Sequence, residues 1–175
     1  MRLSPYREEW PLLYAQERER LEQAIGRYVL DIQHVGSTAV PGLPAKPIID
    51  IGIAVRNFEE AAVCIAPIVA LGYEYVGENG IPRRHYFRKG NPCTHHLHIN
   101  EVDGQDWWNQ IHFRDYLRQH PLSAQAYAAL KMDLAQQFPH DREQYLARKG
   151  PFIEMILHQA RRDGQDKPQG GINVP

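Results

Sequence analysis

The stretch HVGSTAVPGLPAKPIIDIGIAV occupies residues 34–55 and decides the fold prediction, because two kinds of local structure meet in it. Residues 36–44 contain repeated glycine and proline, which predicts a loop. Residues 48–55 are short and rich in β-branched side chains, which predicts a strand. Another strand is expected directly before the loop, at residues 31–35. The stretch therefore predicts two strands connected by a loop.

One carboxylate interrupts the apolar strand at residues 48–55. Because side chains alternate along a strand, positions 49, 51, 53 and 55 form an apolar face that belongs in a core. Asp50 and Gly52 point the other way. An unpaired buried carboxylate would cost several kcal/mol, so Asp50 needs a cation, hydrogen-bond donors or an open cleft. The alternative is a structural role, in which Asp50 caps a helix or pairs with an arginine.

Two histidines lie on one face of a second polar strand, predicted at residues 94–101. His96 and His98 are two residues apart, so their side chains point to the same side. Neutral imidazole is a good ligand for zinc, iron or nickel. If this strand neighbours Asp50, the three side chains form a two-histidine, one-carboxylate metal site. The alternative is a solvated polar face, which the spacing alone favours.

The loop after the first strand could bind an anion. Backbone amides at Gly36, Ser37 and Thr38 can point into one concavity, and Lys46 could add a positive charge. The spacing differs from that of a P-loop. A plain turn is the alternative.

The segment RRHYFRK at residues 83–89 is basic and contains two aromatic residues. Alternation places Arg84, Tyr86 and Arg88 on one face, where a phosphate-bearing ligand could bind. The alternative interpretation is an exposed edge strand that its charges keep soluble.

The other segments predict a helical N-terminus and a helical second half. The expected elements, in chain order, are helices at 8–28 and 58–71, strands at 72–76 and 84–88, and helices at 106–119 and 121–137. Asp141 is expected to cap a short helix that ends near Gly150, and Pro151 to begin a last helix. This order predicts an α/β (α+β) protein with a mixed β-sheet flanked by helices and with C-terminal helices.

Length and composition are those of one ordinary globular domain. Of the 175 residues, 43% are hydrophobic and 23% are charged. We expect a single domain at residues 1–160 and a tail at 161–175. The net charge of −1 disfavours nucleic acid and anionic membranes as partners. No signal peptide and no apolar run of ~20 residues is visible, so we expect a cytoplasmic protein without a membrane partner.

Several motifs, in order, resemble the GrpB family, also called UPF0157. Residues 34–51 resemble its signature segment, and HHLHI at 95–99 resembles its histidine strand. Later matches are FRDYLR at 113–118 with His120-Pro121, YAALK at 127–131, and the pattern at 145–153. Together they cover about residues 6–160.

The resemblance implies a fold similar to nucleotidyltransferases. Their hallmark is Gly-Ser after one strand, followed by two acidic residues, two apart, on the next. It places Gly36 and Ser37 in the loop that holds phosphates, and Asp50 at the first metal-binding acid. The second acidic position falls on Gly52. His96, His98 or Glu101 could replace the lost ligand. If the histidines do so, a softer ion such as Zn²⁺ is expected instead of Mg²⁺, because Mg²⁺ prefers oxygen.

Three hypotheses about function follow. The first is an enzyme that binds a nucleotide or phosphorylated small molecule and transfers a nucleotidyl or phosphoryl group with a divalent metal ion. The second is a catalytically inactive nucleotide-binding module, and the third is a metal-dependent enzyme with unrelated chemistry. All three require Asp50 and Ser37 on the same side of the sheet. The candidate residues are Asp50 and His98 for catalysis; Gly36, Ser37, Thr38, Lys46 and Arg84 for phosphate or nucleotide binding; and Asp50, His96 and His98 for metal.

Overall fold

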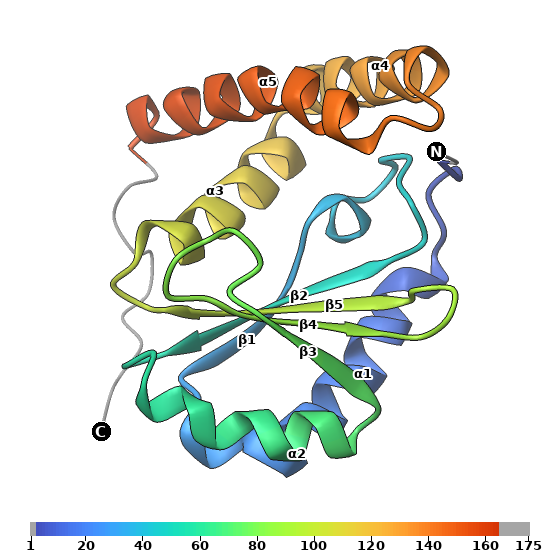
Figure 1. Cartoon of the computed structure of the whole chain (residues 1–175). Coiled ribbons are helices and arrows are strands. Elements are labelled where there is room, and N and C mark those ends of the chain that lie inside the picture. The colour runs from blue at the N-terminus through green and yellow to red at the C-terminus, as the bar shows by residue number, and fades with distance from the viewer. Residues whose placement is uncertain (1–2, 165–175) are drawn as a thin grey trace.

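A mixed five-stranded sheet lies between two layers of helices in the computed structural model, which describes residues 3–164 (Figure 1). The strands in chain order are β1 (Asp31–Val35), β2 (Ile49–Val55), β3 (Tyr73–Gly77), β4 (His85–Lys89) and β5 (His95–Glu101). Their spatial order is β1-β2-β5-β4-β3, and only β2 and β5 run parallel among these neighbours. The predicted mixed sheet of the α+β class is therefore confirmed.

Helices cover both faces of the sheet. The α-helices are α1 (Glu9–Ile25), α2 (Ile65–Ala70), α3 (Gln105–Gln119), α4 (Pro121–Gln137) and α5 (Arg142–Arg162). Short 3₁₀ helices are η1 (Gly26–Tyr28), η2 (Ser37–Ala39) and η3 (Glu60–Cys64). Figure 1 shows α1 and α2 below the sheet and the three C-terminal helices above it.

The lower face of the sheet forms the main core. Ile51 and Ile53 of β2, with Leu97 of β5, are fully buried there. They pack in one cluster with residues of α1 and α2, including Leu21 and Ile68. This confirms the apolar face predicted for residues 49–55. Burial of side chains of this size contributes about 1.5–3 kcal/mol each, so the core fixes which face of β2 is left for Asp50.

A second cluster lies among the upper helices. It joins Val40 and Leu43 of the loop after β1 to buried residues of α3, α4 and α5, among them Leu117 and Ile156. Val40 and Leu43 thereby anchor the loop against the upper helices, although Pro41 and Gly42 between them are exposed. This packing brings the C-terminal helices to the Gly36–Ser37 turn.

Two helix predictions were wrong in detail. Residues 58–71 do not form one helix, because a 3₁₀ segment precedes the short α2; Pro67 lies in the first turn of α2, where its missing N–H has no intrahelical partner in any case. The predicted break at Gly150 is absent, and α5 continues through Pro151. Buried residues on both sides of Pro151, such as Tyr145 and Ile156, hold the two halves against the neighbouring helices.

The basic segment 83–89 is not an edge strand. Within the described sheet, β4 lies between β3 and β5, and β1 and β3 are the edges. His85, Tyr86 and Phe87 are buried. The charge-protected-edge interpretation is therefore wrong.

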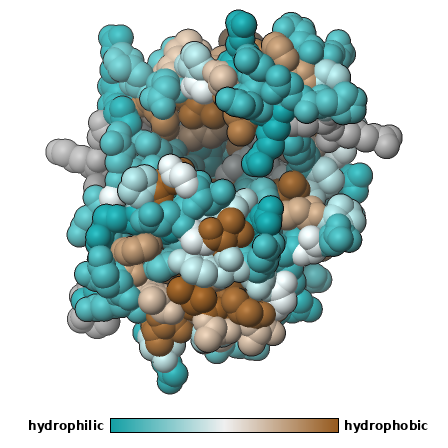
Figure 2. Space-filling view, in the orientation of Figure 1, coloured by the Kyte–Doolittle hydropathy of each residue, from teal (hydrophilic) through white to brown (hydrophobic). Residues whose placement is uncertain are grey.

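The surface view in Figure 2 is largely hydrophilic, with hydrophobic residues gathered in its lower part, over α2, where Val69 is exposed. Across residues 3–164, every helix is too short or too polar to cross a membrane. The predicted tail lies mostly outside the described residues, and its first two positions, 161 and 162, belong to α5.

A buried carboxylate ties α1 to the β3–β4 hairpin. Glu17 of α1 is only 3% exposed. It accepts hydrogen bonds from Tyr73 Oη at 2.8 Å and from Lys89 Nζ at 2.7 Å. Burial raises the pKa of Glu17, but the contacts with Lys89 and Tyr73 outweigh it and hold that pKa below its usual value.

We expect Glu17→Ala to lower the free energy of unfolding by about 3 kcal/mol, because it leaves Lys89 and Tyr73 without their buried partner. The exposed Glu19→Ala on the same helix should change it by less than about 0.5 kcal/mol. Urea denaturation measures both. The difference should be present at neutral pH and shrink in strong acid, where Glu17 with its lowered pKa finally loses its charge. Equal stability of the two variants would contradict the role of Glu17.

Candidate functional site

The parallel pairing of β2 and β5 assembles the Asp50, His96 and His98 cluster. In the register, Asp50 lies beside His96, and Gly52 lies beside His98. His96 Nδ1 is 3.0 Å and His98 Nε2 is 3.4 Å from the same carboxylate atom, Asp50 Oδ1. Donor atoms of all three residues lie within 4.8 Å of one another, a spacing at which they could hold a metal ion. The structure thus brings together the three residues predicted as metal ligands.

Asp50 is ionised in this environment. Burial raises its pKa, but hydrogen bonds from His96 and His98, and their positive charge when protonated, outweigh burial and hold that pKa well below its usual value. An ionised carboxylate only accepts hydrogen bonds, so the imidazole N–H groups donate to it. The alternative that Asp50 pairs with an arginine or caps a helix is therefore wrong.

Tyr86 of β4 packs against both histidines. Its ring centroid is 5.5 Å from that of His96 and 5.2 Å from that of His98. This packing limits how far the two imidazole rings can move. Burial, with the charge of Asp50 as a smaller cause, also raises the pKa of Tyr86 to about 12.

Gly36 allows the turn to approach Asp50. Its φ of +71° lies in the left-handed region that favours glycine. A Cβ built on Gly36 would lie 2.7 Å from Asp50 Oδ2, closer than real Cβ contacts allow. The glycine is therefore required both by the backbone and by the carboxylate next to it.

One pocket contains the carboxylate and the serine on the same side of the sheet. Its volume is about 210 Å³. Of the residues predicted from the sequence, Ser37, Thr38, Lys46, Asp50 and His96 line it. The common requirement of all three hypotheses, that Ser37 and Asp50 share a side of the sheet, is met.

Four basic side chains form the basic wall of this pocket: Lys46, Lys131, Arg142 and Lys149. Lys46 and Lys149 lie over the ring of Tyr145, with Nζ atoms 5.6 and 5.4 Å from its centroid. Burial lowers the pKa of Lys149, Asp50 opposes this, and the charges of Lys46 and Arg142 lower it further. The cations repel one another, so an anion bound between them would relieve that repulsion.

Helix α3 packs against Gly52, which stands where the resemblance expects a second acidic residue. A Cβ on Gly52 would lie 3.1 Å from Gln110 Oε1 and 3.3 Å from the ring of Trp107. Trp107 is buried, and α3 contacts both β2 and β5. A side chain two residues after Asp50 would therefore require Trp107 and Gln110 to shift, and in this chain the histidines of β5 are the groups that complete the cluster.

Two predicted phosphate-binding residues have their polar groups engaged elsewhere. Arg84 does not line the pocket; its guanidinium donates to the carbonyl oxygens of Glu78 and Asn79 and lies 3.4 Å from His98 Nδ1. The Thr38 hydroxyl contacts His34 Nε2 at 2.9 Å and donates to Ile48 O at 3.4 Å. These contacts favour a supporting role for both side chains.

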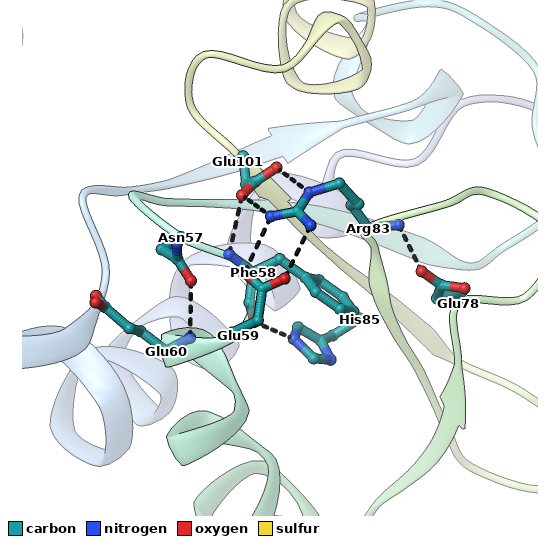
Figure 3. A network of polar contacts seen from close by, with 8 residues as sticks. All are labelled: Asn57, Phe58, Glu59, Glu60, Glu78, Arg83, His85 and Glu101. Carbon is teal, nitrogen blue, oxygen red and sulfur yellow. Dashed lines mark hydrogen bonds and ion pairs between the residues drawn. The ribbon is translucent and has the colours of Figure 1, made fainter.

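The neighbouring Arg83 is also engaged. Figure 3 shows its guanidinium between Glu59 and Glu101, with N–O distances of 2.7–3.0 Å. Glu101 also accepts from the backbone N–H of Phe58. The basic segment at 83–89 thus ties its loop to η3 and to the end of β5.

Sequence reasoning missed the contribution of α4 and α5. Lys131 lies four residues after Tyr127 and three before Leu134, which are both buried on one face of α4. A lysine at a core-facing helical position was the available signal. Arg142 and Lys149 carried no such signal, because they lie among other charged residues of α5.

Comparison with known proteins places the chain in a family. The family model described as GrpB protein matches residues 1–159. The chain belongs to the GrpB family. UPF0157 protein YqkA of Bacillus subtilis is 41% identical over 95% of this chain and 50% of its own length. UPF0157 protein PA4798 of Pseudomonas aeruginosa is 41% identical over 86% and 64%. The chain therefore spans about half to two thirds of the length of these two relatives.

A dephospho-CoA kinase of Mycolicibacterium paratuberculosis is 30% identical over 91% of the chain and 46% of that protein.

Solved structures confirm the fold of the family. The conserved protein GrpB from Enterococcus faecalis superposes with a TM-score of 0.87 at 36% identity, covering 94% of this chain and all of that one. The GLD-2/RNP-8 complex gives 0.59 at 12% identity, over 98% and 72%. The Cid1 poly(U) polymerase with Mg 3′-dATP bound gives 0.53 at 12% identity, over 77% and 43%. These last two show the nucleotidyltransferase-like fold alone.

Gly52→Asp tests whether the two-acid pattern can be restored. We expect it to lower the free energy of unfolding by about 2 kcal/mol, because the side chain overlaps Trp107 and Gln110 in a packed interface. Gly150→Ala is the control, since nothing lies within 4 Å of that Cβ in α5; it should stabilise by ~0.5–1 kcal/mol through helix propensity. Chemical denaturation measures both, and an unchanged or more stable Gly52→Asp protein would refute the closure by α3.

Proposed function

We propose that the chain binds a nucleotide or phosphorylated small molecule together with one divalent metal ion, and transfers its phosphoryl or nucleotidyl group. One observation carries the proposal: Asp50 and His96 line the same pocket as the basic wall. His98 does not line it but lies with Asp50 and His96 in the candidate metal cluster. The side chains that could bind a metal ion belong to the sheet, and most of the basic side chains belong to α4 and α5. A phosphate group held between a metal ion and cations has the electrostatic support that phosphoryl transfer requires.

The donor set fits a transition-metal ion better than magnesium. Two imidazoles and one carboxylate suit Zn²⁺ or a similar ion, whereas Mg²⁺ prefers oxygen ligands. When bound, such an ion polarises a phosphoryl oxygen as a Lewis acid. For His96 and His98 to coordinate an ion through the nitrogens that now contact Asp50, those nitrogens must carry no proton; a change of tautomer to the other ring nitrogen achieves this.

The local charge supports an anionic ligand. The whole chain carries a net charge of −1, yet four basic side chains and a single carboxylate, Asp50, line this pocket. The Gly36–Ser37 turn adds backbone N–H groups of the kind that bind anions. A compact, highly charged group such as a phosphate matches these features better than an apolar ligand.

A catalytically inactive nucleotide-binding module is the second candidate. The observation that favours it is the closed position at Gly52, which leaves one carboxylate where the fold can hold two. Turnover separates the candidates: the enzyme should consume ATP or dephospho-CoA in a metal-dependent reaction that Asp50→Asn abolishes, and the module should bind without turnover.

Metal binding can be tested with Co²⁺, which gives visible absorption. The wild-type protein should bind about one ion per chain, and Asp50→Asn and His96→Ala should each weaken binding by more than ~100-fold, since even outer-shell changes cost 10–100-fold. His158→Ala, exposed on α5, is the control and should bind like wild type. A wild-type protein that takes up no ion would refute the metal site.

Anion binding can be tested with pyrophosphate by calorimetry. Lys149→Met should weaken binding about tenfold, or ~1.4 kcal/mol, through the loss of one charged contact. Arg148→Met is the matched control, because Arg148 is the preceding residue of α5, is exposed and does not line the pocket. Equal losses in both variants would indicate only a general charge effect and contradict the basic wall.

A further inference from the structure

The amine of Lys131 is buried against the hydroxyl of Ser37. Lys131 is only 3% exposed, and its Nζ lies 3.0 Å from Ser37 Oγ. The same Nζ donates to Pro44 O at 2.6 Å and lies 4.7 Å from the ring centroid of Tyr127. These contacts hold the amine nitrogen within hydrogen-bond distance of the serine hydroxyl.

The surroundings of Lys131 favour an uncharged amine. Burial, together with the positive charge of Lys149 on α5, lowers the pKa of Lys131 to about 7. The groups that face it are Ser37 and Pro44 O from the loop, Tyr127 from its own helix, and Lys149 from α5. No carboxylate is among the contacts described for its Nζ, so none of these contacts opposes the lowered pKa, and the amine in its neutral form can accept a proton.

Because the site has Gly52 in place of a second acidic residue, another group is required to activate the nucleophile. In a two-carboxylate site, metal ions can activate the attacking oxygen as well as the phosphoryl group. Here α3 excludes the second acid, and the remaining cluster suits one ion. Activation of a nucleophile must then come from another group, and Ser37 shares the pocket with both Asp50 and Lys131.

We propose that Ser37 is a nucleophile and that Lys131 is its general base, in a reaction that passes through a phosphoserine. This inference rests on the proposed function and names the acceptor of the phosphoryl group. Ser37 Oγ forms a bond to phosphorus, its proton passes to Lys131 Nζ, and the bond from phosphorus to the leaving oxygen breaks. Lys131 returns the proton to the leaving oxygen, and water then hydrolyses the phosphoserine to free Ser37 and phosphate.

A fluorophosphonate probe tests the pair without knowledge of the natural substrate. Attack by Ser37 Oγ forms a P–O bond and releases fluoride from the P–F bond. The intact mass of the wild-type protein should show one adduct per chain, and peptide mapping should place it on Ser37. The labelling rate should rise with pH, with a midpoint near 7 that reports the loss of the Lys131 proton.

Variants separate a base from a structural lysine. Lys131→Arg keeps a cation that cannot give up its proton at neutral pH, and labelling should fall by ~100-fold with loss of the midpoint near neutrality. Ser37→Ala should show no adduct. Ser123→Ala, on α4 outside the pocket, should label like wild type.

Labelling of the wild-type protein can overturn the inference by itself, so the test does not depend on whether a variant folds. Absence of a Ser37 adduct on both sides of neutral pH, or a labelling rate that does not change with pH, would overturn it. Undiminished labelling of a folded Lys131→Arg protein would do so too. If Co²⁺ and pyrophosphate still bind as predicted, the proposed function stands and only the serine mechanism fails; if labelling succeeds without pyrophosphate binding, the proposed function fails.

Discussion

The pairing of β2 with β5 is the constraint on which the site depends. A parallel register places His96 beside Asp50 and His98 beside Gly52, and a shift by one residue would turn both histidines to the opposite face. The apolar lower face prevents that shift, because it would move Leu97 and Ile99 out of the core. The same hydrophobic burial that stabilises the sheet therefore also positions the donors around Asp50.

The two sides of the pocket come from different layers of the protein. The candidate metal ligands belong to the sheet, whereas the basic residues Lys131, Arg142 and Lys149 belong to α4 and α5. The loop between β1 and β2 joins them: Val40 and Leu43 pack under the upper helices, and Ser37 and Lys46 reach the pocket. A ligand that contacts both sides would stabilise the docking of the upper helices on the sheet, since it binds only their assembled arrangement.

Local patterns predicted the strands well, because alternation and β-branched residues are properties of neighbouring positions. Residues 31–35 form β1 as expected, and β2 begins one residue later than expected. The orientation of Asp50, His96 and His98 followed from the same alternation. Contacts in three dimensions were harder to predict than strands. Nothing near Arg84 in the sequence indicated that its guanidinium would donate hydrogen bonds to backbone carbonyl oxygens. Pro151 indicated a helix start, but packing of α5 on both sides of it overrides that local preference.

The basic residues of α4 and α5, which the sequence analysis did not predict, set this site apart from the Gly-Ser and two-acid pattern of nucleotidyltransferases. The Gly-Ser turn and Asp50 are recognisable in sequence, but α3 packs against Gly52, and Asp50 is the one carboxylate that lines the pocket. Under the proposed function, a single carboxylate on the sheet side would hold less metal charge, so more of the charge on a phosphorylated ligand would be balanced by basic side chains. Lys46 of the loop and Arg142 and Lys149 of α5 line the pocket, and Lys131 of α4 lies beside Ser37. The single carboxylate and these basic side chains are complementary parts of the proposed phosphate site.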